Sequence, residues 1–172
     1  MGAEYEDYIP TGHWYWQDNS DEVAFTVQPS TGDGIFSVIH YMVSVFVPTS
    51  ANKGTLYHDG SASPEPYTVK GDVMTIQSSF GEMRCNRIDT KQVVGQWKFI
   101  QAGHTYICDF QPTGKGTETR QDNDAVWLFI YFATSETTGH IFFGPDNEYE
   151  YEIDGDKMIM KNEEASWELT KL

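Results

Sequence analysis

The sequence has little of three features that would place it in a common functional class. It contains 11 lysine and arginine residues against 26 aspartate and glutamate residues, a formal charge of −15, and so lacks the basic surface that nucleic-acid binding requires. Two cysteines in 172 residues are too few for a disulfide scaffold. No apolar run approaches the roughly 18 to 20 residues of a membrane helix. These absences argue against a nucleic-acid partner and against a membrane span in this chain.

Signatures of catalysis and metal binding are also missing. The five histidines occur singly, without the His-x-His or His-x-x-x-His spacing of a zinc site. There is no Gly-x-Ser-x-Gly elbow and no cysteine beside a histidine. The glycines around Lys115 lack the spacing of a phosphate-binding loop. We therefore predict a protein that is not an enzyme and uses no metal and no cofactor, although the fold alone decides whether two carboxylates form a pair.

What the chain does contain is enough large apolar material for a folded core. Aromatic residues make up 15% and apolar residues 39% of the sequence, despite a mean hydropathy of −0.50. Cys85 and Cys108 each lie in an alternating apolar stretch, which favours two buried free thiols, with one disulfide between them as the alternative. Residues 1–10 are acidic where a signal peptide would be basic and then apolar, so we expect a soluble chain.

One sequence pattern occurs twice along the chain. The two occurrences are offset by 82 to 85 residues, so their register differs only by small changes in loop length. A repeat of this kind predicts a tandem duplication. The matched segments are 12–14 and 95–97, 28–34 and 111–116, 53–57 and 138–142, and 67–76 and 151–160.

Both copies are expected to consist of short antiparallel strands, because no window shows a helical period. Tyr106, Cys108 and Phe110 alternate along one such strand, and glycine hairpins are expected at 70–72 and 154–156. About seven strands per copy predict an all-β protein made of two tandem small antiparallel meander β-barrels. A single larger barrel built from both copies is the alternative. The expected domains are an N-terminal extension over 1–10, copy 1 over 11–91 and copy 2 over 92–172.

Two further patterns concern surfaces. Residues 125–132 and much of 35–47 are apolar on both strand faces, so we expect their outer faces to be covered by the other copy or by a second chain. The alternative is a thick local core in which Trp127 fills space. Between 148 and 156 every second residue is acidic. Because copy 1 lacks this feature, a solvated outer face is a better interpretation than a calcium site.

The motif that opens each copy resembles a known family. Gly12-His13-Trp14 and Gly95-Gln96-Trp97 resemble the first-strand motif of the lipocalins and the wider calycin group. With the late Tyr-x-Ile-x-Gly-Asp hairpin, the chain looks most like the short lipocalin-like domains of small bacterial exported proteins and lipoproteins. The resemblance implies that each tryptophan closes one end of a barrel under a basic residue of the last strand. Arg87 and Lys171 are the residues in that place.

The resemblance also implies a function. A lipocalin-like protein binds a small hydrophobic ligand without a catalytic step and is extracytoplasmic, in the periplasm or at the cell surface. The surplus of aromatic residues agrees with such a ligand. A full lipocalin uses about this whole length for one barrel, so each small barrel would admit at most one small ligand. The candidate ligand-binding residues are Trp16, Phe25, Phe99, Cys108 and Phe110.

Two other functions stay open at this point. A structural or protein-interaction module would use the doubly apolar strands to bind a protein partner of the cell envelope. A carbohydrate-binding module would show coplanar tryptophan and tyrosine side chains on one sheet face. An enzyme is the least supported class, because it would need two carboxyl groups converging in a cleft with raised pKa values.

Overall fold

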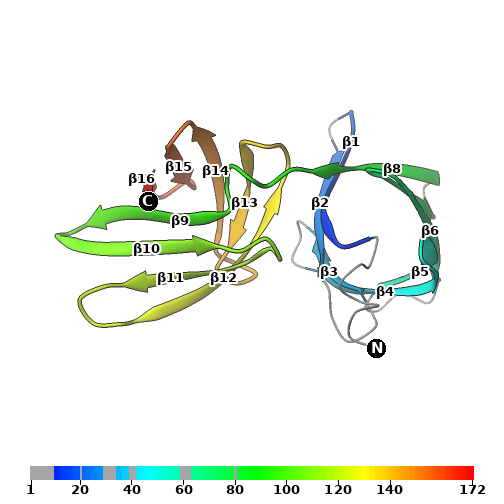
Figure 1. The fold of residues 1–172 in the computed structure, drawn as a ribbon, viewed down its shortest axis with the longest axis horizontal. Coiled ribbons are helices and arrows are strands. Elements are labelled where there is room, and N and C mark those ends of the chain that lie inside the picture. The colour runs from blue at the N-terminus through cyan, green and yellow to red at the C-terminus, as the bar shows by residue number, and fades with distance from the viewer. Residues whose placement is uncertain (1–9, 20, 29–33, 39–41, 59–62, 80) are drawn as a thin grey trace. The chain divides into compact units, whose positions relative to one another are not determined.

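The computed structural model shows a chain of β-strands and turns (Figure 1). It describes residues 10–19, 21–28, 34–38, 42–58, 63–79 and 81–172. These residues form sixteen strands and no helix, which confirms the all-β fold class. No helix among them is long and apolar enough to cross a membrane. The chain divides after Ile88 into unit 1 and unit 2, three residues before the boundary that the repeat indicated.

Unit 1 is an eight-stranded antiparallel meander. Each strand pairs with the next, and β8 returns to pair with β1 through Arg87 and Trp14. The count exceeds the expected seven because the apolar run at 35–47 contains two strands with no glycine, proline, asparagine or aspartate between them. The strands are β1 (Gly12–Asp18), β2 (Asp21–Gln28), β3 (Gly34–Val38), β4 (Met42–Ser50), β5 (Lys53–His58), β6 (Glu65–Lys70), β7 (Val73–Ser78) and β8 (Gly81–Ile88).

Unit 2 repeats this order of strands. Its eight strands pair antiparallel in sequence, and β16 returns to β9 through Lys171 and Trp97. Each unit is therefore barrel-like and has its own circuit of strands. This agrees with the expectation of two small units and not with the alternative of one larger barrel. The strands are β9 (Gly95–Gln101), β10 (His104–Phe110), β11 (Lys115–Arg120), β12 (Val126–Ala133), β13 (Thr138–Phe142), β14 (Glu148–Asp154), β15 (Lys157–Lys161) and β16 (Ser166–Lys171).

A buried tryptophan lies near one end of each unit. The side chains of Trp14 and Trp97 are both 0% exposed. The indole Nε1 of Trp14 donates to the carbonyl oxygen of Pro10 at 2.7 Å, and that of Trp97 donates to the carbonyl oxygen of Val93 at 2.9 Å. Since each acceptor lies four residues before its tryptophan, the segment that precedes the first strand is tied to that end of the unit.

The basic residue expected over each indole is present in both units. The guanidinium carbon of Arg87 lies 4.3 Å from the centroid of the Trp14 ring, and Lys171 Nζ lies 5.3 Å from that of Trp97. Lys171 Nζ also donates to the carbonyl oxygen of Gln92 at 2.8 Å. These contacts combine a cation–π attraction with a hydrogen bond, and so hold the last strand against the chain that enters the first.

The two cysteines are free and buried, as expected, and they belong to different cores. Cys85 lies in the core of unit 1 and Cys108 in that of unit 2. Burial raises the pKa of Cys85 to about 12 and raises the pKa of Cys108 as well. Both therefore remain thiols at neutral pH and are poor nucleophiles while the units stay folded. Each cysteine can report on the opening of its own unit.

The doubly apolar strand β12 is covered over only part of its outer face. Val126 and Leu128 are 54% and 73% exposed, contrary to the expectation that the outer face is buried. Farther along, Phe132 is buried and its ring meets that of Phe142 edge-on at 5.6 Å. In unit 1 the corresponding expectation for residues 35–43 falls outside the described side chains. Trp127 belongs to the opposite face of β12, where it meets a cavity.

Candidate functional site

Unit 2 contains a cavity of about 350 Å³. Its lining residues come from the late part of β9, the early part of β10 and the corresponding ends of the other strands. This is the end of the unit that carries the β9–β10, β11–β12, β13–β14 and β15–β16 turns. Gly95 and the turn between β10 and β11 lie at the other end, where Trp97 is buried. The cavity therefore opens at the end away from the segment that precedes β9.

Ten residues line the cavity, and seven of the eight strands of unit 2 contribute at least one of them. Six of the ten are aromatic, and the other four are Gln101 at the end of β9, Glu118 on β11, Asn147 in the β13–β14 turn and Met160 on β15. Alternation along each strand explains the arrangement, because side chains two residues deeper belong to the core. We call the six aromatic residues the aromatic collar: Phe99 on β9, Tyr106 on β10, Trp127 on β12, Phe143 next to the end of β13, Tyr149 on β14 and Trp167 on β16.

The rings of the collar touch one another in a continuous series. All neighbouring centroids lie within the range typical of interacting aromatic pairs, about 4.5–7 Å. Such contacts fix the rings relative to one another, so the collar is an organised wall. The series runs Trp127 to Tyr106 at 6.3 Å, Tyr106 to Phe99 at 4.8 Å, Phe99 to Trp167 at 5.8 Å, Trp167 to Tyr149 at 5.3 Å and Tyr149 to Phe143 at 5.8 Å.

Glu118 is the one acidic residue among those that line this cavity. Its side chain is half-buried, and its Oε1 accepts a hydrogen bond from Cys108 Sγ at 3.6 Å. Burial raises the pKa of the Glu118 carboxyl, and the contact with Cys108 offsets part of that rise. Within the described part of the chain no lysine or arginine forms an ion pair with it. The carboxyl therefore lies among aromatic rings without a cationic partner.

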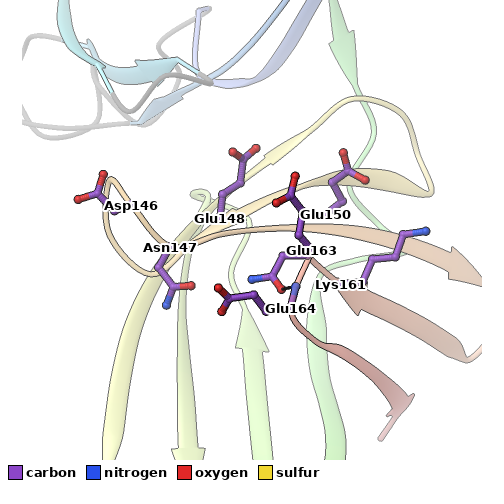
Figure 2. A pocket seen from close by; sticks show the side chains of 8 residues that line it. Asp146, Asn147, Glu148, Glu150, Lys161, Glu163 and Glu164 are labelled. Carbon is purple, nitrogen blue, oxygen red and sulfur yellow. Dashed lines mark hydrogen bonds between the residues drawn. The ribbon is translucent and has the colours of Figure 1, made fainter.

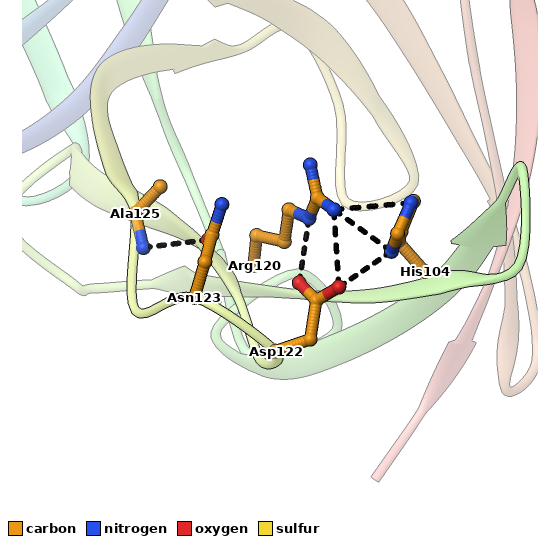
Figure 3. A network of polar contacts seen from close by, with 5 residues as sticks. All are labelled: His104, Arg120, Asp122, Asn123 and Ala125. Carbon is orange, nitrogen blue, oxygen red and sulfur yellow. Dashed lines mark hydrogen bonds and ion pairs between the residues drawn. The ribbon is translucent and has the colours of Figure 1, made fainter.

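The nearest arginine along β11 is committed elsewhere. Arg120 follows Glu118 by two residues on the same strand face. Its Nε and Nη2 donate to the two carboxylate oxygens of Asp122 at 2.6 and 3.0 Å, and Nη2 lies 2.9 Å from His104 Nδ1 (Figure 3). His104 Nδ1 in turn lies 2.6 Å from Asp122 Oδ2. This network holds the guanidinium against Asp122 and His104.

The network makes a prediction about pH. Hydrogen bonds from Arg120 lower the pKa of Asp122 from 3.8 to about 2. Any stabilisation from this contact is present above the ordinary pKa and is lost as the pH falls toward about 2. In Arg120→Gln we expect the Asp122 carboxyl to titrate at a higher pH than in the wild type. Carboxyl chemical shifts followed by NMR measure this directly, and an unchanged midpoint would show that Arg120 does not hold Asp122.

A larger groove of about 690 Å³ borders the cavity, since Asn147 lines both. It is acidic and open (Figure 2). The alternating acidic residues of β14 are exposed, which confirms the solvated outer face expected for 148–156. No group of three or more potential metal ligands occurs among the residues described. The remaining lining residues are Asp146, Glu148, Glu150, Lys161, Asn162, Glu163 and Glu164.

Of the five residues predicted to bind a ligand, only Phe99 lines the cavity. Cys108 and Phe110 are buried in the core of unit 2 beneath it. Trp16 and Phe25 belong to unit 1, where Phe25 is in the core and Trp16 packs against it. Sequence reasoning missed the rest of the collar and Glu118. The sequence signal for Glu118 was that successive side chains of β11 face opposite ways. Only the pairing of Glu118 with Cys108 shows that the side chain of Glu118 is on the internal face of the strand.

Unit 1 does not repeat the collar. The strand registers identify matching positions: Phe25 pairs with Val38 in unit 1 as Cys108 pairs with Glu118 in unit 2. Val38 therefore stands at the position where unit 2 has the half-buried Glu118. The residues of unit 1 that match Phe99, Tyr106, Trp127, Tyr149 and Trp167 are Trp16, Val23, Met42, Glu65 and Met83.

Comparison of the chain with protein-family models, with curated proteins and with solved structures finds no match. An assignment of function therefore rests on the residues of this chain. The collar and Glu118 are the strongest basis for one, because they place six aromatic rings and one carboxyl group that can orient a bound molecule around one cavity.

Proposed function

We propose that unit 2 reversibly binds a small, largely apolar molecule in the aromatic collar, without a catalytic step. The observation that carries the proposal is that six aromatic side chains from around the circuit of strands line a single cavity, together with Gln101, Glu118, Asn147 and Met160. Its volume of about 350 Å³ lies within the range of small-molecule sites, about 300–1,000 Å³. The collar offers a ligand large rigid surfaces at little cost in side-chain entropy.

We also infer that the two units arose by duplication of a lipocalin-like domain. Beyond the Gly-x-Trp motif, they share irregular contacts that a common strand count would not require. The backbone N–H of Arg87 donates to the carbonyl oxygen of Asp72 at 2.9 Å, and that of Lys171 donates to the carbonyl oxygen of Asp156 at 2.8 Å. By the same resemblance, we propose that the protein acts outside the cytoplasm, in the periplasm or at the cell surface. In this proposal unit 2 binds the ligand, and unit 1 has diverged from unit 2 at the positions that match the aromatic collar.

The other candidate functions have less support. A carbohydrate platform needs aromatic rings that lie flat on one sheet face, whereas the collar rings come from strands all around one cavity. Sugar hydrolysis needs two carboxyl groups, but Glu118 is the one acid among the described residues that line the cavity. An envelope protein partner could use the exposed Val126 and Leu128, although these two residues alone form a small surface.

Neighbouring residues of β12 provide a matched test. Trp127 lines the cavity, whereas Leu128 faces the other side and is 73% exposed. The neutral fluorescent probe N-phenyl-1-naphthylamine is expected to bind the wild type saturably. Trp127→Ala should weaken that binding by about tenfold, because it removes a large apolar contact, and Leu128→Ala should leave it unchanged. Equal affinities in the two variants, or no saturable binding of any ligand to the wild type, would contradict the proposal.

A further inference from the structure

The cavity of unit 2 joins two features that a single ligand could use. One is a wall of six aromatic rings in mutual contact, and the other is a carboxyl group set within that wall. A neutral apolar ligand would use the rings alone. It would leave Glu118 desolvated against an apolar surface, which is unfavourable for a charged group. The pairing of rings and acid indicates a ligand with both apolar surface and positive charge.

We propose that the ligand of the collar is an organic cation, an alkylated or quaternary ammonium compound, whose charge lies against the collar rings and pairs with Glu118. This inference rests on the proposed function and specifies the chemical class of its ligand. The face of an aromatic ring attracts a cation through its quadrupole, most strongly in tryptophan, and the attraction increases in a desolvated site. Trp127 and Trp167 supply two such rings, from β12 and β16.

No cation among the described residues of the protein pairs with Glu118. Glu118 accepts a hydrogen bond from the neutral thiol of Cys108, which does not balance a negative charge. Arg120, the cation closest along the strand, has its guanidinium bound to both oxygens of Asp122. Lys161 lines the neighbouring acidic groove and not this cavity. A bound ammonium group would therefore supply the positive charge that Glu118 lacks within the described residues.

The electrostatic surroundings favour the same class of ligand. The acidic groove shares Asn147 with the cavity and carries Glu148, Glu150, Glu163 and Glu164 close to its rim. The whole chain has a formal charge of −15. A field of this sign concentrates cations near the opening and repels anions. In this proposal the acidic groove attracts cations toward the cavity, and the cavity is the binding site.

Unit 1 supports the inference as an internal contrast. At the matching positions it has Val38 in place of Glu118 and Met42 in place of Trp127. The buried tryptophan and the basic residue over it are retained in both units. Of the five matched collar positions, unit 1 has an aromatic ring only at Trp16, and it has an acid, Glu65, at the position of Tyr149. The acid at the position of Glu118 and most of the collar rings are therefore particular to unit 2.

The test compares two ligands of nearly the same shape. Choline carries a quaternary ammonium group, and 3,3-dimethylbutan-1-ol is its neutral carbon counterpart. Titration calorimetry of the full chain should show choline binding about tenfold or more tightly than the neutral compound. Glu118→Gln keeps the size of the side chain and should reduce that preference several-fold, leaving the part that the rings contribute. Its matched control, Glu163→Gln, removes the same charge from the groove and should change choline affinity less than about twofold, since exposed charges are screened.

Each outcome has a definite meaning. If choline and the neutral compound bind with equal affinity and Glu118→Gln changes neither affinity, the proposed ligand class is wrong, although the cavity still binds small molecules. If Glu118→Gln weakens both ligands equally, the residue only shapes the site and the cation proposal fails. If neither these ligands nor the neutral probe bind the wild type, the proposed function fails as well. If the protein binds phosphatidylcholine vesicles, and both free choline and the Glu118→Gln substitution prevent that binding, the ligand is a lipid headgroup. If the protein binds free choline but not the vesicles, the ligand is a soluble cation.

Discussion

Replacing Trp97 with alanine is expected to destabilise unit 2 by about 3–5 kcal/mol, because it leaves a cavity where the indole packs. Trp97 is 0% exposed and lies within a core cluster formed only by residues of unit 2. The substitution also removes the donor to the carbonyl oxygen of Val93 and the ring beneath Lys171. An effect of this size is comparable with the whole stability of a small domain, about 5–15 kcal/mol.

The two buried cysteines allow this effect to be assigned to one unit. After a brief exposure to an alkylating reagent, mass spectrometry should find Cys108 modified in Trp97→Ala and Cys85 still protected. Trp14→Ala is the matched variant and should give the opposite pattern, because Trp14 and Cys85 share the core of unit 1. Equal labelling of both cysteines in either variant would show that the two cores do not unfold separately.

Substituting Gly139 with alanine is expected to cost about 1–3 kcal/mol through overpacking. A Cβ at this position would lie 2.4 Å from the carbonyl oxygen of Phe132 and 2.4 Å from the ring of Tyr151. Neither can easily withdraw, since Phe132 lies in the paired strand β12 and Tyr151 is 3% exposed in the core. Denaturant unfolding of the wild type and the variant measures the loss.

Gly54 in unit 1 provides the control for this prediction. A Cβ there would lie 2.4 Å from the carbonyl oxygen of Val47 and 2.5 Å from the Tyr67 hydroxyl. Because a tyrosine covers a glycine in both units, Gly54→Ala should lower the free energy of unfolding by a similar amount. In this variant Cys85 should become accessible to the alkylating reagent, whereas in Gly139→Ala it should be Cys108. A loss below about 0.5 kcal/mol in both variants would contradict the packing described here.

Local chemistry explains why much of the fold was predictable. Gly71 and Gly155 adopt φ angles of 61° and 63° in the expected hairpin turns, a conformation that glycine adopts at little cost. The cation over each tryptophan was expected from the lipocalin resemblance, and the repeated pattern identified Arg87 and Lys171 as the residues in that place. The break between β3 and β4 was not, because residues 39–41 contain none of the usual turn formers.

The site was harder to foresee because it depends on contacts between distant segments. Phe99 and Trp167 meet only because β16 returns to β9 and closes the circuit of strands. Along the chain, Glu118 lies in a polar stretch between Thr117 and Thr119 and gives no sign of an internal position. Its place follows from the strand register, which no local pattern determines. The aromatic surplus noted in the sequence led us to predict a ligand, but it did not show which rings would gather around one cavity.

The indole N–H signals of the five tryptophans test the central claim most directly. In a ¹H–¹⁵N NMR spectrum of the full chain, added choline should shift the signals of Trp127 and Trp167, which line the cavity. Those of Trp14 and Trp97 should stay in place, since both are buried near other ends of the strands. Shifts confined to Trp14 and Trp16, or no shift at saturating choline, would contradict a cation site in the collar of unit 2.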